Sequence, residues 1–182
     1  MTMRFGRLES GSTVEWYTPP EIFEALGLTF DLDPCAPSGG LPWVPAQRFF
    51  SRADDGLARP WGGRVWLNPP YGAGIEQWMR KLATHGNGIA FVHARTSTVW
   101  WRQALSSATA ICFVAGGVRF MTDRRGTRPS GNSPLPLVLL AYGTPCALAL
   151  MQSGLGPCLI VPPGTLPGLS LAERRKAKDS SR

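Results

Sequence analysis

The chain has 182 residues, of which 43% are hydrophobic, and a formal net charge of +7. This length fits one domain with a sizeable core, and the charge favours a polyanionic partner, although excess charge also serves solubility. The four cysteines are far apart, with no C-x-x-C pair and no clustered histidine, which argues against a metal site and for reduced thiols. No apolar run approaches the length that spans a bilayer and no signal peptide is visible, so we expect a cytoplasmic protein without a membrane partner.

The first helix is well marked. Thr18 is expected to cap it, Pro19 suits its first turn, and Glu21 completes a T-x-x-E capping box with Thr18. Gly27 can end the helix after the apolar residues of positions 22–26 have faced inward. A strand over residues 29–33 follows at once, and residues 34–63 then form a long, partly irregular crossing over the strand ends.

The remaining elements alternate between strand and helix, which indicates an α/β sheet covered by helices. After Gly116 and Gly117, which permit a tight turn, the chain is expected to run back antiparallel. The expected strands are residues 64–68, 88–93, 109–115, 118–121, 135–142 and 147–151, and the expected helices are residues 75–85 and 97–107. The domain is expected over residues 15–168, between a flexible arm (residues 1–14) and a basic, disordered tail (residues 169–182).

The motif Asn68-Pro69-Pro70-Tyr71, which follows the apolar run of residues 65–67, is the most informative feature. An exocyclic amine on adenine is a poor nucleophile because its lone pair is delocalised, so an enzyme must draw the nitrogen toward tetrahedral geometry. The side-chain oxygen of Asn68 and the backbone carbonyl of Pro69 can each accept one N–H, on a loop that two prolines stiffen. Tyr71 offers an aromatic face to a base that has left its stack. The motif therefore suits methyl transfer to a planar amine.

Other interpretations of this motif stay open. Two prolines after a strand are a common turn device, and tyrosine is frequent at the rim of a protein. The same chemistry also fits guanine amines in RNA and glutamine side chains in proteins. A basic DNA-binding module that kept the fold without cofactor binding is a further, non-enzymatic alternative.

Open α/β sheets bind ligands beyond the carboxyl ends of their strands, and three polar segments, one opening the first helix, one ending the first strand and one preceding the second, qualify as cofactor contacts. The segments concerned are Tyr17-Thr18-Pro19, Asp33-Pro34-Cys35-Ala36 and Asp54-Asp55-Gly56-Leu57. A nucleoside-bearing cofactor such as S-adenosylmethionine presents a ribose diol, an adenine amine and an ammonium group, from which Asp33 and Asp55 can accept hydrogen bonds. Turn formation alone is the competing explanation for these carboxylates.

Tryptophans fall into two sets. Trp78, Trp100 and Trp101 lie at helical spacing and are expected to pack in the core. Trp61, just before the strand at residues 64–68, and Trp66, within it, can shape a cofactor pocket, and burial alone is the competing explanation.

Taken in chain order, the segments at residues 17–19, 33–36, 55–57 with Trp61, and 68–71 resemble the phage-type DNA N-6-adenine-methyltransferase (Dam-like) family. The similarity continues through His93-Ala94-Arg95-Thr96, Gly117-Val118-Arg119-Phe120 and Asn132-Ser133-Pro134, and so covers approximately residues 15–143. The resemblance implies a Rossmann-like fold, S-adenosylmethionine as methyl donor, methylation of adenine in double-stranded DNA, and action in the host cytoplasm if the gene belongs to a phage or prophage. It suggests residues 68–71 as the amine-binding loop. The cofactor contacts it suggests are Tyr17, Thr18, Asp33, Pro34, Ala36 and Asp55.

The chain departs from the wider methyltransferase superfamily in its first half. No G-x-G follows the first strand, and only 35 positions (68 − 33) separate Asp33 from Asn68, too few for two intervening strand-helix units. We therefore expect a single-domain, shortened Rossmann-like S-adenosylmethionine-dependent methyltransferase fold with an antiparallel C-terminal part of the sheet.

Arginines mark a candidate nucleic-acid surface. Residues 122–136 are rich in arginine and glycine, and form either a flexible loop sized to lie along a phosphate backbone or a solvated hairpin tip. Arg95 ends the strand after the expected helix at residues 75–85 and should face the same edge as the Asn-Pro-Pro-Tyr motif, unless it forms a structural ion pair. Arg119 is either a phosphate contact or an exposed edge residue. The candidate DNA contacts are Arg95, Arg119, Arg124, Arg125 and Asn132.

Overall fold

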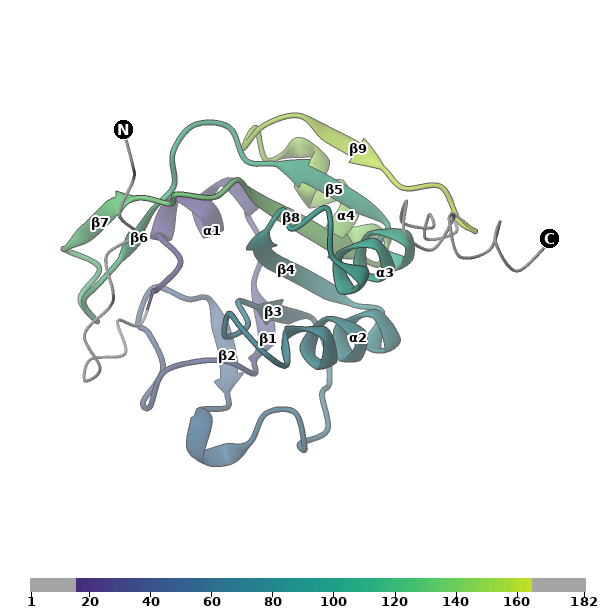
Figure 1. Ribbon diagram of the computed structural model, residues 1–182. Helices are drawn as coiled ribbons and strands as arrows, with labels where there is room; N and C mark the ends of the chain where they lie inside the picture. Colours follow the sequence, from purple (N-terminus) through teal and green to yellow (C-terminus); the bar gives the residue numbers. More distant parts are fainter. Residues whose placement is uncertain (1–15, 165–182) are drawn as a thin grey trace, which may run out of the picture.

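A computed structural model describes residues 16–164, with a seven-stranded sheet at its centre and a separate two-stranded hairpin (Figure 1). The expected arm (residues 1–14) and basic tail (residues 169–182) lie outside the described residues. The strands are β1 (Phe30–Asp33), β2 (Ala46–Phe49), β3 (Val65–Leu67), β4 (Gly88–His93), β5 (Ala110–Phe113), β6 (Arg119–Met121), β7 (Pro129–Asn132), β8 (Leu137–Tyr142) and β9 (Cys158–Ile160). The helices are α1 (Pro20–Leu26), η1 (Arg52–Asp54, one 3₁₀ turn), α2 (Ile75–His85), α3 (Val99–Ser107) and α4 (Thr144–Gln152).

The sheet is mixed, in the order β2-β1-β3-β4-β8-β5-β9. Strands β1, β2, β3 and β4 are parallel, whereas β8 runs antiparallel between β4 and β5, and β9 runs antiparallel to β5. This confirms the expected α/β sheet with an antiparallel C-terminal part. Because β1, β3 and β4 are parallel, the segments that follow them meet at one edge of the sheet.

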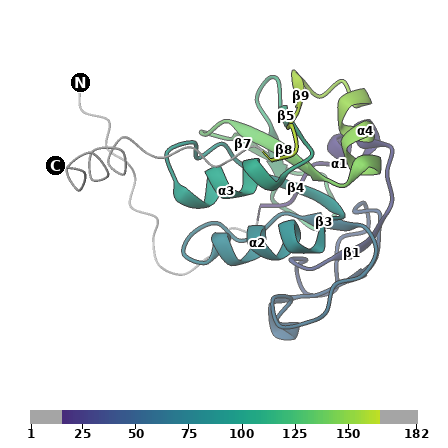
Figure 2. The same cartoon turned by 90° about the vertical axis from the view of Figure 1, so that its right-hand side faces the viewer.

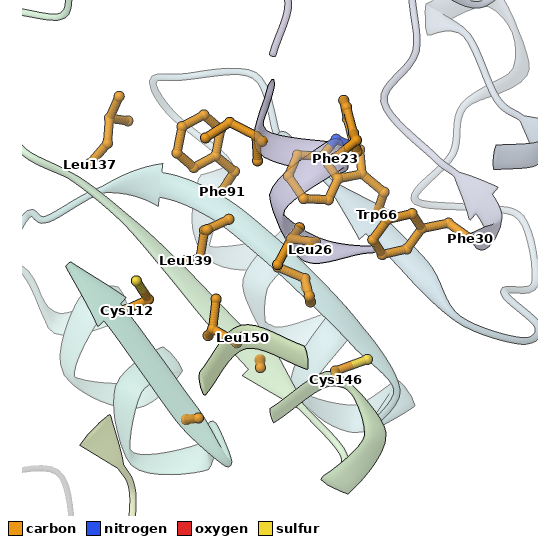
Figure 3. Packing of buried hydrophobic residues seen from close by; sticks show 14 of the residues in the cluster. Phe23, Leu26, Phe30, Trp66, Phe91, Cys112, Leu137, Leu139, Cys146 and Leu150 are labelled. Atoms are coloured by element: carbon orange, nitrogen blue, oxygen red, sulfur yellow. The ribbon is translucent and has the colours of Figure 1, made fainter. Parts of the chain in front are cut away.

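Helices cover both faces of the sheet, with α2 and α3 on one side and α1 and α4 on the other (Figure 2). Alternation along β3 serves both layers, because Trp66 packs in the cluster beneath α1 and α4 while Val65 and Leu67 pack beneath α2 and α3. Figure 3 shows Phe23 of α1 and Phe30 of β1 against the Trp66 ring, with centroid distances of 4.6 and 5.4 Å to that ring. The strand that leads into the Asn-Pro-Pro-Tyr motif is therefore fixed from both sides.

The start of the first helix differs from the expectation. The N-cap is Pro19, no side chain caps the helix, and the Oγ1 of buried Thr18 has no hydrogen-bond partner within the described residues, so the expected capping box is wrong. The helix begins one residue late because Pro19 holds the extended conformation (ψ 148°), which carries Thr18 away from the helix end. Its C-terminus is as expected, with Gly27 in the left-handed conformation at φ 60°.

Several strand assignments also need correction. Residues 46–49, expected to be irregular, form the edge strand β2, whose mostly exposed side chains give no hydrophobic alternation. Residues 118–121 do not return along β5; β6 instead pairs with the unexpected β7. Residues 147–151 belong to α4, and the last sheet position is taken by β9. The alternation of alanine and leucine in this segment resembles a strand, but its buried residues (146, 147 and 150) follow helical spacing.

Candidate active site

A cavity of about 660 Å³ opens at the carboxyl edge of β1 and β3. Its volume lies within the range of small-molecule sites. All ten residues that the sequence indicated as catalytic or cofactor-binding line it: Tyr17, Thr18, Asp33, Pro34, Ala36, Asp55, Asn68, Pro69, Pro70 and Tyr71. Sheet topology therefore unites four segments that lie far apart in the chain.

Asn68 enters the cavity directly after β3. Its side-chain Nδ2 donates to the backbone carbonyl of Trp16 at 3.3 Å, whereas its Oδ1 is buried and has no partner within the described residues. A buried acceptor without a partner is costly, and in native structures it usually marks a bound ligand or water. The Trp16 carbonyl thus orients the amide so that its acceptor oxygen is left without a partner among residues 16–164.

Tyr71 closes the Asn-Pro-Pro-Tyr loop (residues 68–71, called the acceptor loop below). Its ring is 40% exposed, lines the cavity and stacks on the His93 ring, with centroids 4.2 Å apart and an interplanar angle of 26°. His93 Nε2 also lies 3.4 Å from the hydroxyl of Ser133. Burial and the nearby charge of Arg95 lower the pKa of His93, which keeps its imidazole neutral near pH 7. One face of the tyrosine ring is therefore supported by a neutral aromatic ring.

Asp33 is the buried carboxyl group of the cavity, with 6% exposure. Its Oδ1 accepts the backbone N–H of Cys35 at 3.0 Å. Burial raises the pKa of Asp33 from 3.8 to about 7, and the Cys35 hydrogen bond only partly opposes this effect. A carboxyl group with a strongly perturbed pKa in a cavity is a candidate functional group, because a ligand that donates to it restores the ionised form.

The carboxylates of Asp54 and Asp55 have different surroundings. Asp54 accepts hydrogen bonds from the Ser51 hydroxyl (2.6 Å) and backbone N–H (2.8 Å), and these bonds lower its pKa, so its role is to cap η1. Asp55 lines the cavity and is the one non-glycine residue between positions 16 and 164 with positive φ (52°). Gly56 follows it in close contact with Pro34, since a Cβ at Gly56 would lie 2.2 Å from the Pro34 carbonyl oxygen.

The predicted DNA contacts lie outside the cavity, mostly on the β6–β7 hairpin, which projects away from the sheet (Figure 1). Arg119 and Asn132 are opposite each other in the hairpin, and Arg124 and Arg125 lie in its exposed turn. The hairpin is anchored beside the cavity, because the backbones of Tyr17 and Met121 exchange hydrogen bonds of 3.0 and 2.8 Å. Arg95 is exposed just beyond β4.

Several lining residues were missed by the sequence interpretation. Arg52 and Trp78 line the cavity, although Trp78 was expected only to pack in the core and Arg52 carried no motif signal. Trp66 lines the cavity as expected, whereas Trp61 lies behind it and stacks on Trp78. The orienting role of Trp16 involves a backbone carbonyl, which any residue offers, so no sequence signal could have revealed it.

Two absences concern the part of the chain that the structure describes. Between residues 16 and 164, no three histidine, cysteine or acidic side chains gather in a way that could hold a metal ion. No helix in the same range is long and apolar enough to cross a membrane.

Comparison with known proteins adds one positive finding. A sequence model of the family described as DNA N-6-adenine-methyltransferase (Dam) matches residues 8–145, which include all the strands that border the cavity. Searches of curated proteins and of solved structures give no match.

Proposed function

The chain belongs to the DNA N-6-adenine-methyltransferase (Dam) family, and we propose that its cavity holds the methyl donor beside an adenine flipped out of double-stranded DNA. The family methylates N6 of adenine in DNA with S-adenosylmethionine, so guanine in RNA and glutamine in proteins are not the acceptors. The observation that carries the site assignment is that Asn68, which lines the cavity, has a buried Oδ1 with no hydrogen-bond partner among residues 16–164.

The residues around the cavity fit the donor. S-adenosylmethionine supplies an electrophilic methyl group on a sulfonium, and its ribose hydroxyls, ammonium and adenine amine are hydrogen-bond donors. Asp33 and Asp55 offer carboxylate acceptors, and the Oγ1 of Thr18, which has no hydrogen-bond partner in the described part of the chain, offers a further polar contact. Tyr17, Pro34 and Ala36 complete this wall. We therefore assign these six residues to donor binding.

The acceptor loop prepares the amine. Asn68 Oδ1 and the Pro69 carbonyl each accept one N–H of the adenine amine, which draws its lone pair out of conjugation and toward the methyl group. Tyr71 stacks on the flipped base, while His93 supports the opposite face of the tyrosine ring. The nitrogen loses its proton after the new N–C bond has formed, so the neutral His93 is not needed as a base.

The β6–β7 hairpin supplies the contact to DNA. Arg119, Arg124, Arg125 and Asn132 lie along phosphates, and Arg95 approaches the backbone near the acceptor loop. The net charge of +7 supports a polyanionic substrate. We place the proposed activity in the cytoplasm, where the DNA substrate is found.

Labelled methyl transfer tests this proposal. The wild-type protein should transfer label from S-adenosylmethionine to unmethylated double-stranded DNA, and nucleoside analysis should identify N6-methyladenine. Asn68→Ala should abolish transfer and leave the donor Kd within a few-fold, because the side chain acts on the acceptor amine. Asn68→Asp keeps an acceptor oxygen and should retain measurable transfer. Equal activity of Asn68→Ala and wild type would refute the assigned role of Asn68.

A further inference from the structure

Lys81 forms hydrogen bonds to the loop of residues 55–59, which carries Asp55 at the wall of the cavity. It lies on α2, the helix that follows the acceptor loop, and does not line the cavity itself. Its Nζ donates to the carbonyl oxygens of Gly56 (3.4 Å), Leu57 (2.6 Å) and Arg59 (2.5 Å). An ammonium group has three N–H donors, so these carbonyls use the complete head group of Lys81.

Two tryptophans extend this arrangement toward the cavity. The Lys81 Nζ lies 4.8 Å from the centroid of the Trp61 ring, and Trp61 Nε1 donates to the Gly56 carbonyl at 2.8 Å. Trp61 in turn stacks on Trp78, with centroids 6.1 Å apart, and Trp78 lines the cavity. Residues 61, 78 and 81 thus form a clamp on the loop of residues 55–59.

The clamped loop needs such support. Asp55 holds a left-handed backbone conformation, which is uncommon for a residue with a side chain, although aspartate adopts it more readily than most. Gly56 is pressed against the Pro34 carbonyl, next to Asp33. Burial lowers the pKa of Lys81, and the negative charge of Asp55 partly opposes this shift, so the two side chains interact. Loop, lysine and carboxylate are therefore physically coupled.

We propose that Lys81 is a positioning residue for the methyl donor: through the carbonyls of Gly56, Leu57 and Arg59 it fixes Asp55 at the cavity wall. This inference rests on the proposed donor site. Helix α2 begins four residues after Tyr71, so the helix that follows the acceptor loop also carries the lysine that binds the loop of residues 55–59. The acceptor loop and the loop that carries Asp55 are therefore supported by the same helix.

Steady-state kinetics with S-adenosylmethionine and DNA test the role of Lys81. Lys81→Met keeps the approximate length of the side chain but removes its three N–H groups. The KM and Kd for S-adenosylmethionine should therefore rise about ten-fold. The kcat should stay within about two-fold and KM for DNA should not change. Arg80→Met is the matched control, because Arg80 is the exposed neighbour on α2 and pairs only with Glu76 in the described residues; it should leave all constants unchanged.

A double-mutant cycle gives the sharper readout. If Lys81 acts through Asp55, then Asp55→Asn combined with Lys81→Met should weaken donor binding no more than the stronger single substitution. Additive losses, a fall in kcat at constant KM, or an unchanged KM would overturn the proposal. Should Lys81→Met fail to fold, Trp61→Phe removes one hydrogen bond to Gly56 and keeps the ring packing; it should raise the donor KM a few-fold, and an unchanged KM would equally overturn the proposal.

The outcomes separate this inference from the proposed site. If Asp33→Asn and Asp55→Asn leave donor binding unchanged, the donor site itself is misassigned. If both weaken binding while Lys81→Met and Trp61→Phe do not, only the positioning role of Lys81 fails.

Discussion

Replacement of Asp33 by asparagine should make the ligand-free protein more stable and at the same time weaken donor binding. The folded pKa of Asp33 is about 7 against an ordinary value of 3.8, which corresponds to about 4 kcal/mol at about 1.4 kcal/mol per pH unit. Because the folded value is the higher one, the folded state binds more protons between about pH 4 and pH 7. Stability therefore falls as the pH rises through this window and levels off above it.

The variant removes this dependence. The amide keeps an oxygen that can accept the Cys35 N–H, and it has no charge to desolvate. From about pH 5 to about pH 8, the difference in unfolding free energy between Asp33→Asn and wild type should widen by about 2–3 kcal/mol in favour of the variant. Urea denaturation of both proteins without ligand measures this difference, and calorimetry should show at least about ten-fold weaker binding of S-adenosylmethionine. A difference that does not change with pH would refute a raised pKa at Asp33, and unchanged donor affinity would remove Asp33 from the donor site.

Two further predictions concern the walls of the cavity and the hairpin. Gly56→Ala should weaken binding of S-adenosylmethionine more than about ten-fold, because the new Cβ would lie 2.2 Å from the Pro34 carbonyl oxygen and the loop must shift. Gly131→Ala is the control: a Cβ at this position has no atom of the described residues within 4 Å, so affinity for S-adenosylmethionine and Tm should not change. Equal affinities of the two variants would contradict this packing argument. Arg124→Ala combined with Arg125→Ala should lower the slope of log K for DNA against log salt by about two and leave donor binding unchanged, whereas an unaltered slope would show that the hairpin turn does not meet phosphates.

The acceptor loop was predictable because its signal is local. Residues 65–71 contain the strand, the two prolines, the polar side chain and the ring in one continuous segment, and β3 places them at the edge that parallel strands share. Asp33 and Asp55 followed from the same rule about strand ends. The partners of these residues did not follow, because the Trp16 carbonyl that orients Asn68 lies 52 positions away in sequence.

The errors have a common physical origin in segments whose hydrophobic pattern is weak or ambiguous. Strand β2 has almost no buried side chain, and β7 consists of proline, serine, glycine and asparagine, so neither shows the alternation of a half-buried strand. In α4, small and large apolar residues alternate as in a strand, and only tertiary packing shows that Leu148 is exposed while Ala147 and Leu150 are buried. Pairing partners decide such segments, and pairing is not encoded locally.

The shortened first half of the fold explains why the donor wall depends on tertiary clamps. Between Asp33 and Asn68 the chain provides two strands, β2 and β3, and a single 3₁₀ turn, without a glycine-rich loop directly after β1 to cradle a nucleoside. Asp55 must therefore return to the strand end on an irregular loop, and an irregular loop has no backbone ladder to hold it. The close contact of Gly56 with Pro34 and the three hydrogen bonds of Lys81 supply that restraint. The donor side should accordingly tolerate fewer substitutions in the loop of residues 55–59 than in the exposed turn of the hairpin.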